Sequence, residues 1–242
     1  QNGVAGSTIG SPDDYSITAL PNGWYDVSLT TTSISKVDFQ VYTSDSDGSY
    51  IYEGDGVSGV YVWGAQLEVG GYPTSYIPTS GTIVTRVAET CAGAGDAYTF
   101  NSTEGVLYAQ IAALADDLTN RIISLSDGTN VNRIHLFYFP LNNTIVANCR
   151  VAGSTVVSFL LALTDIKDFV KIAFRWQSGD FNCYVNGLSI GTSSNTTMFP
   201  ENTLNELSFR RGDGANNFYG KAEDLRVYNT PLTNKELQTL TT

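Results

Sequence analysis

The segment from Arg210 to Tyr219 carries the residue types with which proteins bind sugars. It reads Arg-Arg-Gly-Asp-Gly-Ala-Asn-Asn-Phe-Tyr, so charged and amide side chains stand next to two aromatic rings. Charged and amide groups hydrogen-bond sugar hydroxyls, aromatic faces stack on sugar rings, and such groups commonly lie on loops over a rigid scaffold. We therefore predict a glycan site with five contributing side chains: Arg210, Asp213, Asn216, Asn217 and Tyr219.

The same segment also fits an ordinary surface loop. In that interpretation Asp213-Gly214 forms a turn, and Phe218 or Tyr219 packs in the core. The tryptophans offer no better platform for a sugar, because each lies within an expected strand, where large aromatic rings pack in the core. They are Trp24, Trp63 and Trp176.

An acidic stretch between residues 45 and 55 is a candidate site for Ca²⁺, which binds carboxylate oxygens. Its four carboxylates are Asp45, Asp47, Glu53 and Asp55. The spacing does not fit an EF-hand, because Gly56 stands where that loop places its bidentate glutamate. The alternative is a solvated turn whose aspartates accept hydrogen bonds from their own backbone.

Groupings that could catalyse a reaction are sparse, so we predict a non-enzymatic protein without catalytic residues. Glycoside hydrolysis needs two carboxylates flanking one bond, and Glu53–Asp55 is an isolated group in a glycine-rich loop. The adjacent pair Glu223-Asp224 lies in an expected strand, where neighbouring side chains point to opposite faces. His135 is the only histidine and alternates with apolar residues, which predicts a polar residue on the outer face of a strand.

Composition indicates an all-β protein. Only 15% of the 242 residues are charged, and the chain is rich in glycine and aromatic residues. The 13 basic and 24 acidic residues give a net charge of −11, which disfavours nucleic acid as a partner. No apolar run reaches about eighteen residues, so we expect no membrane insertion. The cysteines are interpreted as small buried apolar residues, with their redox state left open: Cys91, Cys149 and Cys183.

Alternating patterns predict a long series of strands in the second half of the chain. The expected strands are 106–113, 121–126, 133–139, 144–151, 155–163, 169–176, 181–185, 188–192, 206–210 and 220–228. Asn186-Gly187 is the dipeptide that best fits a type I′ hairpin turn. After them, Thr233 and Glu236 form the pattern of a capping box for a short helix that closes one end of the sandwich.

The first half predicts only three strands, over 24–29, 36–42 and 60–67. So few strands leave edges and one apolar face uncovered, so we expect upstream sequence or a partner chain to complete the domain. Paired glycines and two prolines mark residues 71–90 as a connector. The expected domains are therefore 1–70 and 91–242.

Two resemblances cover most of the chain. Residues 54–79, with Pro21–Ser28 upstream, resemble the end of a jelly-roll module found in bacteriophage tail, fibre and other virion-surface proteins, and related jelly rolls occur as carbohydrate-binding modules. The Val185–Gly187 hairpin, residues 218–228 and the helix over 231–240 are similar to the closing elements of a concanavalin A-like, laminin-G-like domain.

The resemblances imply two β-sandwiches, a partial jelly roll and then a complete concanavalin A-like sandwich. They imply a non-enzymatic phage fibre or spike component on the virion surface that binds host-surface glycans. They also imply contact with other virion proteins and a homo-oligomer, for which a trimer is one form. Two alternatives stay open, a purely structural capsid or tail decoration protein and the accessory carbohydrate-binding part of a polysaccharide-degrading enzyme.

Overall fold

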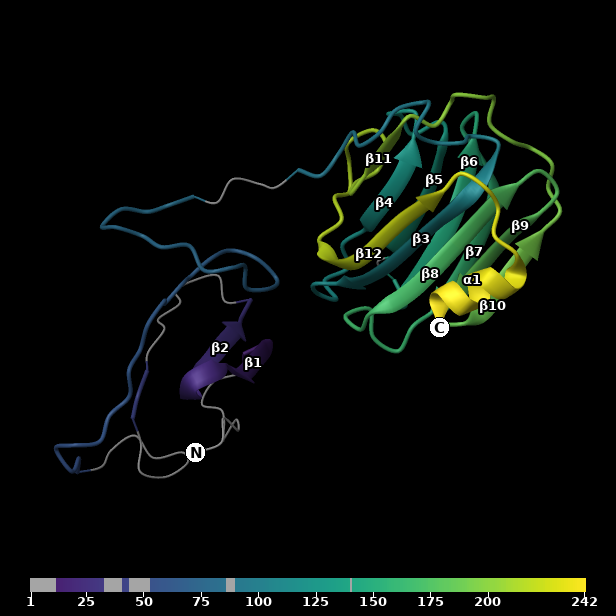
Figure 1. Ribbon diagram of the computed structural model, residues 1–242. Helices are drawn as coiled ribbons and strands as arrows, with labels where there is room; N and C mark the ends of the chain where they lie inside the picture. Colours follow the sequence, from purple (N-terminus) through teal and green to yellow (C-terminus); the bar gives the residue numbers. More distant parts are fainter. Residues whose placement is uncertain (1–11, 33–40, 44–52, 86–89, 140) are drawn as a thin grey trace. The chain divides into compact units, whose positions relative to one another are not determined.

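The computed structural model describes residues 12–32, 41–43, 53–85, 90–139 and 141–242. The chain divides into two compact units, Gln1–Arg86 and Val87–Thr242 (Figure 1). No helix in the described ranges has both the length and the hydropathy that crossing a membrane requires.

The second unit is a sandwich of two five-stranded antiparallel sheets. Sheet I has the order β10-β9-β8-β3-β12, and sheet II has the order β11-β4-β5-β6-β7. The strands are β3 (Glu104–Ala113), β4 (Arg121–Ser126), β5 (Arg133–Phe139), β6 (Thr144–Val151), β7 (Ser154–Ala162), β8 (Val170–Gln177), β9 (Phe181–Val185), β10 (Leu188–Ser193), β11 (Glu206–Ser208) and β12 (Gly220–Tyr228). The predicted all-β fold is confirmed.

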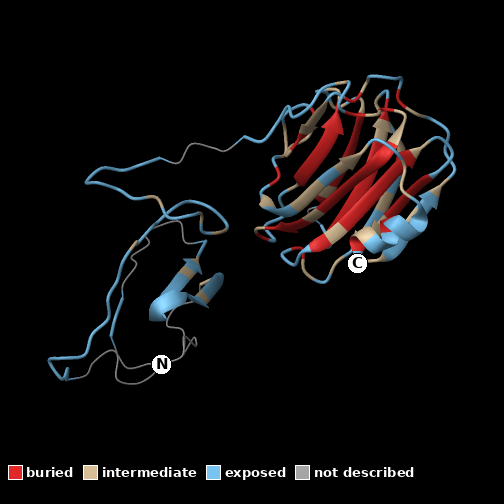
Figure 2. Cartoon of the chain, in the orientation of Figure 1, coloured by how far each residue is buried: buried red, intermediate tan, exposed pale blue. Residues whose placement is uncertain are grey.

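The core lies between the two sheets (Figure 2). Side chains alternate along each strand, so one set from each sheet points inward. Phe174 and Trp176 of sheet I pack with Leu136 and Tyr138 of sheet II, and all four are fully buried. This packing fixes which residues of sheet II face outward.

The predicted hairpin joins β9 and β10. Asn186 and Gly187 both have positive φ, at 46° and 80°. A type I′ turn requires this conformation at its two central residues, which is why the Asn-Gly dipeptide marks it.

The predicted helix is α1 (Asn234–Thr241), and Thr233 and Glu236 form its capping box. Its apolar side covers the outer face of sheet I, where Leu237 is buried against Val106, Tyr108 and Ala173. The expectation that the helix closes one end of the sandwich is therefore wrong. The outer face of sheet I is apolar at this point, so it needs a cover.

In the first unit, β1 (Asp14–Ala19) pairs antiparallel with β2 (Tyr25–Thr30). The strand expected over 60–67 is absent, and Gly64 has a φ of 70° that no regular ladder accepts. Residues 36–40 of the remaining expected strand lie outside the described residues. The jelly-roll assignment of residues 1–70 stays a prediction.

The aromatic and sulfur side chains correct two expectations. Trp176 is buried as predicted, but Trp63 is 73% exposed and Trp24 is also exposed, because the described part of the first unit builds no core around them. Cys149 and Cys183 are buried, whereas Cys91 is exposed. Burial raises the pKa of Cys149 to about 12, so this thiol is inert.

Candidate functional site

The outer face of sheet II carries a block of polar side chains. The register aligns Ser124, His135, Asn148 and Ser158 in one row across four strands, and Ser126, Arg133, Arg150 and Thr155 in the next. Their neighbours in sequence, such as Ile134 and Leu136, point into the core. An antiparallel sheet with one face on the core leaves its other face for polar residues. We call these two rows the polar rows.

The hairpin loop over 209–218 folds back over β4. Phe218 N–H donates to the backbone oxygen of Phe209 at 2.8 Å, and Ser124 Oγ donates to the backbone oxygen of Arg210 at 2.5 Å. Gly212 of this loop is buried against β4, and an added Cβ there would lie 2.3 Å from the backbone oxygen of Thr129 and 2.6 Å from Ser126 Oγ. The loop therefore packs on the polar rows through a position that only glycine fits.

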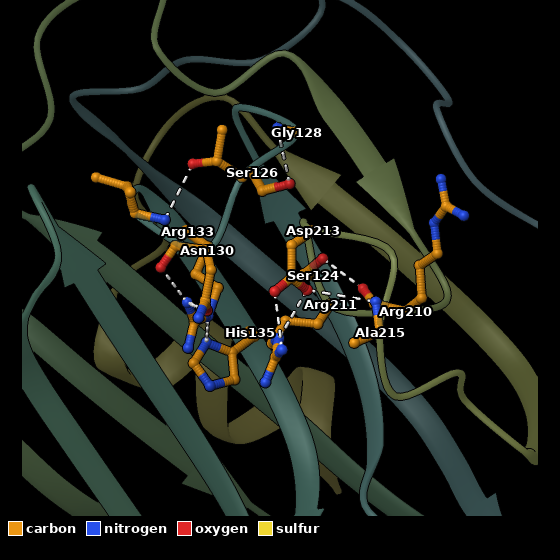
Figure 3. Close-up of polar contacts among 12 residues, drawn as sticks. Ser124, Ser126, Gly128, Asn130, Arg133, His135, Arg210, Arg211, Asp213 and Ala215 are labelled. Atoms are coloured by element: carbon orange, nitrogen blue, oxygen red, sulfur yellow. Dashed lines mark hydrogen bonds and ion pairs between the residues drawn. The ribbon is translucent and has the colours of Figure 1, made fainter.

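This packing brings Arg211 to the side chains of Arg133 and His135 (Figure 3). Arg211 Nε and Nη2 donate to the two carboxylate oxygens of Asp213 at 2.7 and 2.8 Å. Arg133 Nε donates to His135 Nδ1 at 3.1 Å, and its Nη1 bonds the backbone and side-chain oxygens of Asn130. Arg133, His135 and Arg211 thus form a cluster of basic side chains on the outer face of sheet II.

His135 is 4% exposed, and its pKa falls from 6.5 to about 3. Burial is the largest cause, and the charges of Arg133, Arg150 and Arg211 add to it. The imidazole is therefore neutral at neutral pH. Because Nδ1 accepts a hydrogen bond from Arg133, the proton of the neutral ring is on Nε2.

Arg133 has the same surroundings. Burial and the charges of Arg150 and Arg211 lower its pKa from 12.5 to about 10, while Asp213 acts in the opposite direction. The Arg211 guanidinium in turn lowers the pKa of the Asp213 carboxyl. The cluster is thus rich in positive charge, with Asp213 as an internal counter-ion.

The five residues predicted from the sequence divide between two places. Asp213 joins the cluster through Arg211. Asn217 Nδ2 bonds the hydroxyl of Tyr219 at 3.2 Å, and neither bonds Asp213. The side chain of Arg210 extends away from His135 (Figure 3), with a buried Nε that has no hydrogen-bond partner. Asn216 has a φ of 53°, which fits a turn.

The neighbouring aromatic residue, Phe218, is buried and stacks on Tyr138 with ring centroids 6.4 Å apart. Tyr219 is exposed, but its backbone oxygen accepts from Arg121 Nε at 2.6 Å. Phe218 and Arg121 therefore fix the C-terminal end of the loop, just before β12 begins.

Sequence reasoning missed the residues that the sheet places beside the loop: Arg133, Phe137, Phe139, Asn148 and Arg150. Phe137 stacks on His135 with centroids 4.9 Å apart, and the partly exposed Phe139 follows on the same face. The alternation of Arg133, His135, Phe137 and Phe139 was a usable signal for one outward face. The pairing partners on β6 were not readable from that alternation.

The calcium prediction stays a prediction. Asp45 and Asp47 lie outside the described residues. Asp55 accepts hydrogen bonds from the backbone of Val57 and Ser58 and from the Ser58 hydroxyl, and these lower its pKa to about 2. No group of three potential metal ligands gathers within the described ranges.

The adjacent carboxylates of β12 both have protein partners. Glu223 accepts from Gln110, and Asp224 pairs with Arg226 at 2.6 Å. Both lie on sheet I, whereas the polar rows lie on sheet II.

A family model, Laminin_G_3, described as the concanavalin A-like lectin/glucanases superfamily, matches residues 94–238. The chain belongs to this superfamily. The resemblance expected from the hairpin and the C-terminal helix is therefore confirmed. No curated protein matches the chain.

Solved structures of the superfamily fold share little sequence with the chain. The CBM40 of Ruminococcus gnavus IT-sialidase has a TM-score of 0.50 at 18% identity, over 64% of this chain and 96% of that one. The same module bound to α2,6-sialyllactose gives 0.50 at 16%, over the same shares. Domain 4 of AbnA, an extracellular arabinanase from Geobacillus stearothermophilus, gives 0.48 at 13%, over 61% and 70%. The likeness to the CBM40 shows a carbohydrate-binding-module-like fold.

Substitution of Gly212 by alanine tests the packing of the loop. The added Cβ has no room beside Thr129 and Ser126, so we expect a loss of about 1–3 kcal/mol in unfolding free energy, or several degrees in Tm. Thermal unfolding measures it. Gly59→Ala is the control, because nothing lies within 4 Å of its Cβ position. Equal Tm values for the two variants would contradict the described packing.

The single histidine allows a direct test of the cluster by NMR. We expect the His135 imidazole to stay neutral, in the Nε2–H form, down to about pH 4. The unfolded chain binds this proton near its usual pKa of 6.5, so this group makes stability fall as pH drops through 6.5 towards 3. A measured pKa between 6 and 7 would show that the ring is not buried among arginines.

Proposed function

We propose that this chain is a non-enzymatic carbohydrate-binding protein whose glycan site is the outer face of sheet II beside the loop over 209–218. The observation that carries this is a cluster of polar side chains next to an aromatic ridge, formed by Phe137 and Phe139, on one face of sheet II. Sugar sites need both, because hydroxyls require hydrogen-bond partners and the faces of sugar rings require apolar contact.

The polar part of the site lies at His135 and Asn148, which face each other across β5 and β6. They are 4% and 8% exposed, and neither His135 Nε2 nor the Asn148 amide has a hydrogen-bond partner among the described residues. Both groups can therefore bond a sugar hydroxyl that reaches this face.

The apolar part is formed by Phe137 and Phe139, whose ring centroids lie 6.4 Å apart. Phe139 is 41% exposed, and Leu160 of β7 is exposed as well. These side chains lie on the same face of sheet II as His135, further along the strands. A sugar that bonds His135 therefore finds an apolar surface next to it.

The CBM40 structures support this assignment, because one of them holds α2,6-sialyllactose. The state of Asp213 supports a binding role over a catalytic one. Its carboxylate is held by two nitrogens of Arg211, and its lowered pKa keeps it ionised at neutral pH, so it lacks the proton that a general acid must supply.

We further propose that the glycans are those of a bacterial host surface and that the chain acts on a phage virion. This rests on the sequence resemblance of residues 54–79 to virion-surface modules. A structural role is the second candidate. It is favoured by exposed apolar side chains in the first unit, where Tyr61, Trp63, Leu67 and Val69 are all strongly exposed. Such surfaces commonly mark contacts with another chain, either a second copy or a further virion protein.

A glycan array with the full chain tests the proposed function. We expect binding to a subset of glycans, and a loss of about tenfold in affinity for Phe139→Ala, because the variant lacks the stacking ring. Tyr98→Ala, at a strongly exposed tyrosine outside the polar rows, is the control and keeps full affinity.

The array is repeated with a chelator and with a combined Asn216→Ala and Asn217→Ala variant. Binding that survives both supports the outer face of sheet II. Loss on chelation moves the site to residues 45–55, and loss in the double variant moves it to the loop tip. No binding at all favours the structural role, and cleavage of a glycan would contradict a non-enzymatic protein.

A further inference from the structure

We propose that the glycan bound at this site carries a negatively charged group, a carboxylate or a sulfate, held by Arg133 and Arg150 with Arg211 beside them. This inference rests on the proposed function. It adds the chemical class of the ligand, which the fold alone does not fix.

The arginines of the described part of the chain divide into two groups. Four pair with an aspartate: Arg121 with Asp117, Arg175 with Asp180, Arg211 with Asp213 and Arg226 with Asp224. Arg133 and Arg150 on the polar rows, and Arg210 in the loop, have no carboxylate partner there. Two of the three unpaired arginines, Arg133 and Arg150, thus lie at the proposed site.

Arg133 and Arg150 stand directly opposite each other on β5 and β6, with side chains on the same face. Like charges in such a cross-strand pair repel and destabilise the sheet. Arg133 is also buried, which removes the water that would otherwise screen this repulsion. An anion between the two guanidinium groups would convert the repulsion into two attractions.

Hydrogen-bond donors dominate the surroundings of this pair. Arg150 Nε donates to the backbone oxygen of Gly153 at 2.7 Å, and its two Nη groups have no protein partner within the described ranges. His135 presents Nε2–H, because its Nδ1 is occupied by Arg133. Guanidinium and imidazole N–H groups match the oxygens of a carboxylate or sulfate, which accept without donating.

The lowered pKa of Arg133 agrees with this arrangement. The neighbouring Arg150 and Arg211 both disfavour its charged form, and Asp213 offsets this only in part. The carboxylate of Asp213 is already shared by two nitrogens of Arg211. A ligand anion would supply the charge that the protein itself lacks here.

The aromatic ridge explains why the anion belongs to a sugar. Phe137 stacks on His135, and Phe139 follows it, so an apolar surface begins where the donor cluster ends. A free phosphate or sulfate ion would use only the donors. An acidic sugar uses both, with its charged group at the arginines and its ring towards the phenylalanines.

Three monosaccharide probes test the inference on the full chain by NMR titration at low salt. The three probes differ only at C6, which is a carboxylate in methyl β-glucuronide, a hydroxymethyl group in methyl β-glucoside and the sulfate ester of that group in methyl β-glucoside 6-sulfate. We expect the two anionic probes to bind at least about tenfold more tightly than the glucoside. The preference of the site between them identifies the anionic group.

Two variants link the preference to the arginines. Arg150→Gln loses the tenfold preference, whereas Arg150→Lys, which keeps the charge, retains part of it. Arg226→Gln on sheet I is the control and keeps it in full. Arg150 is partly exposed, so these variants keep the core intact.

The His135 signal gives an independent readout. A bound anion offsets the arginine charges, so the glucuronide raises the imidazole pKa of the wild type, and inorganic sulfate at equal concentration raises it less. Equal affinity for glucuronide and glucoside, or unchanged preference in Arg150→Gln, overturns the inference while glycan binding itself stands. Binding of sulfate as tight as that of the glucuronide overturns it in favour of a simple anion site.

Discussion

The antiparallel register of β4, β5 and β6 is the constraint from which the proposed site follows. It packs Ile134 and Leu136 into the core, and the same alternation turns Arg133 and His135 outward. It also sets Arg150 and Asn148 directly across from them. A shift by one residue would bury the polar set and expose the apolar one. The hydrophobic core therefore fixes which side chains form the proposed site, because it leaves this set of side chains no other direction.

The loop buries part of the outer face of sheet II and thereby changes the electrostatic surroundings of the side chains there. The loop over 209–218 packs its backbone on β4 at Gly212 and sets Arg211 beside the sheet. Arg133 and His135 are buried here, so the neighbouring charges act on them with little screening. This combination keeps the imidazole of His135 neutral and leaves the cluster short of negative charge. The geometry supports a binding role without needing a reactive group.

Much of the second unit was predictable from the sequence, because short-range patterns determine it. Alternation located the strands, Asn186-Gly187 fixed a hairpin, and Thr233 with Glu236 fixed the helix start. The position of the helix was missed, since which surface its leucines cover depends on the outer face of sheet I. In the first unit, alternation over 60–67 suggested a strand that Gly64 interrupts.

The candidate site was harder to predict, because it depends on contacts between distant parts of the chain. The loop residues were recognisable by type, yet Asp213 acts through its pair with Arg211, and Arg210 turns away. The partners Arg133 and Arg150 are 17 positions apart and meet only through strand pairing. Side-chain type alone cannot reveal such a pair. A covering loop and a sheet register together create it.

The most direct test of the central claim is a map of backbone amide shifts as a bound glycan is added. The account predicts that the largest changes lie on β5 and β6, at His135, Phe137 and Asn148, and in the loop over 209–218. Changes confined to sheet I, to α1 or to the first unit would contradict it.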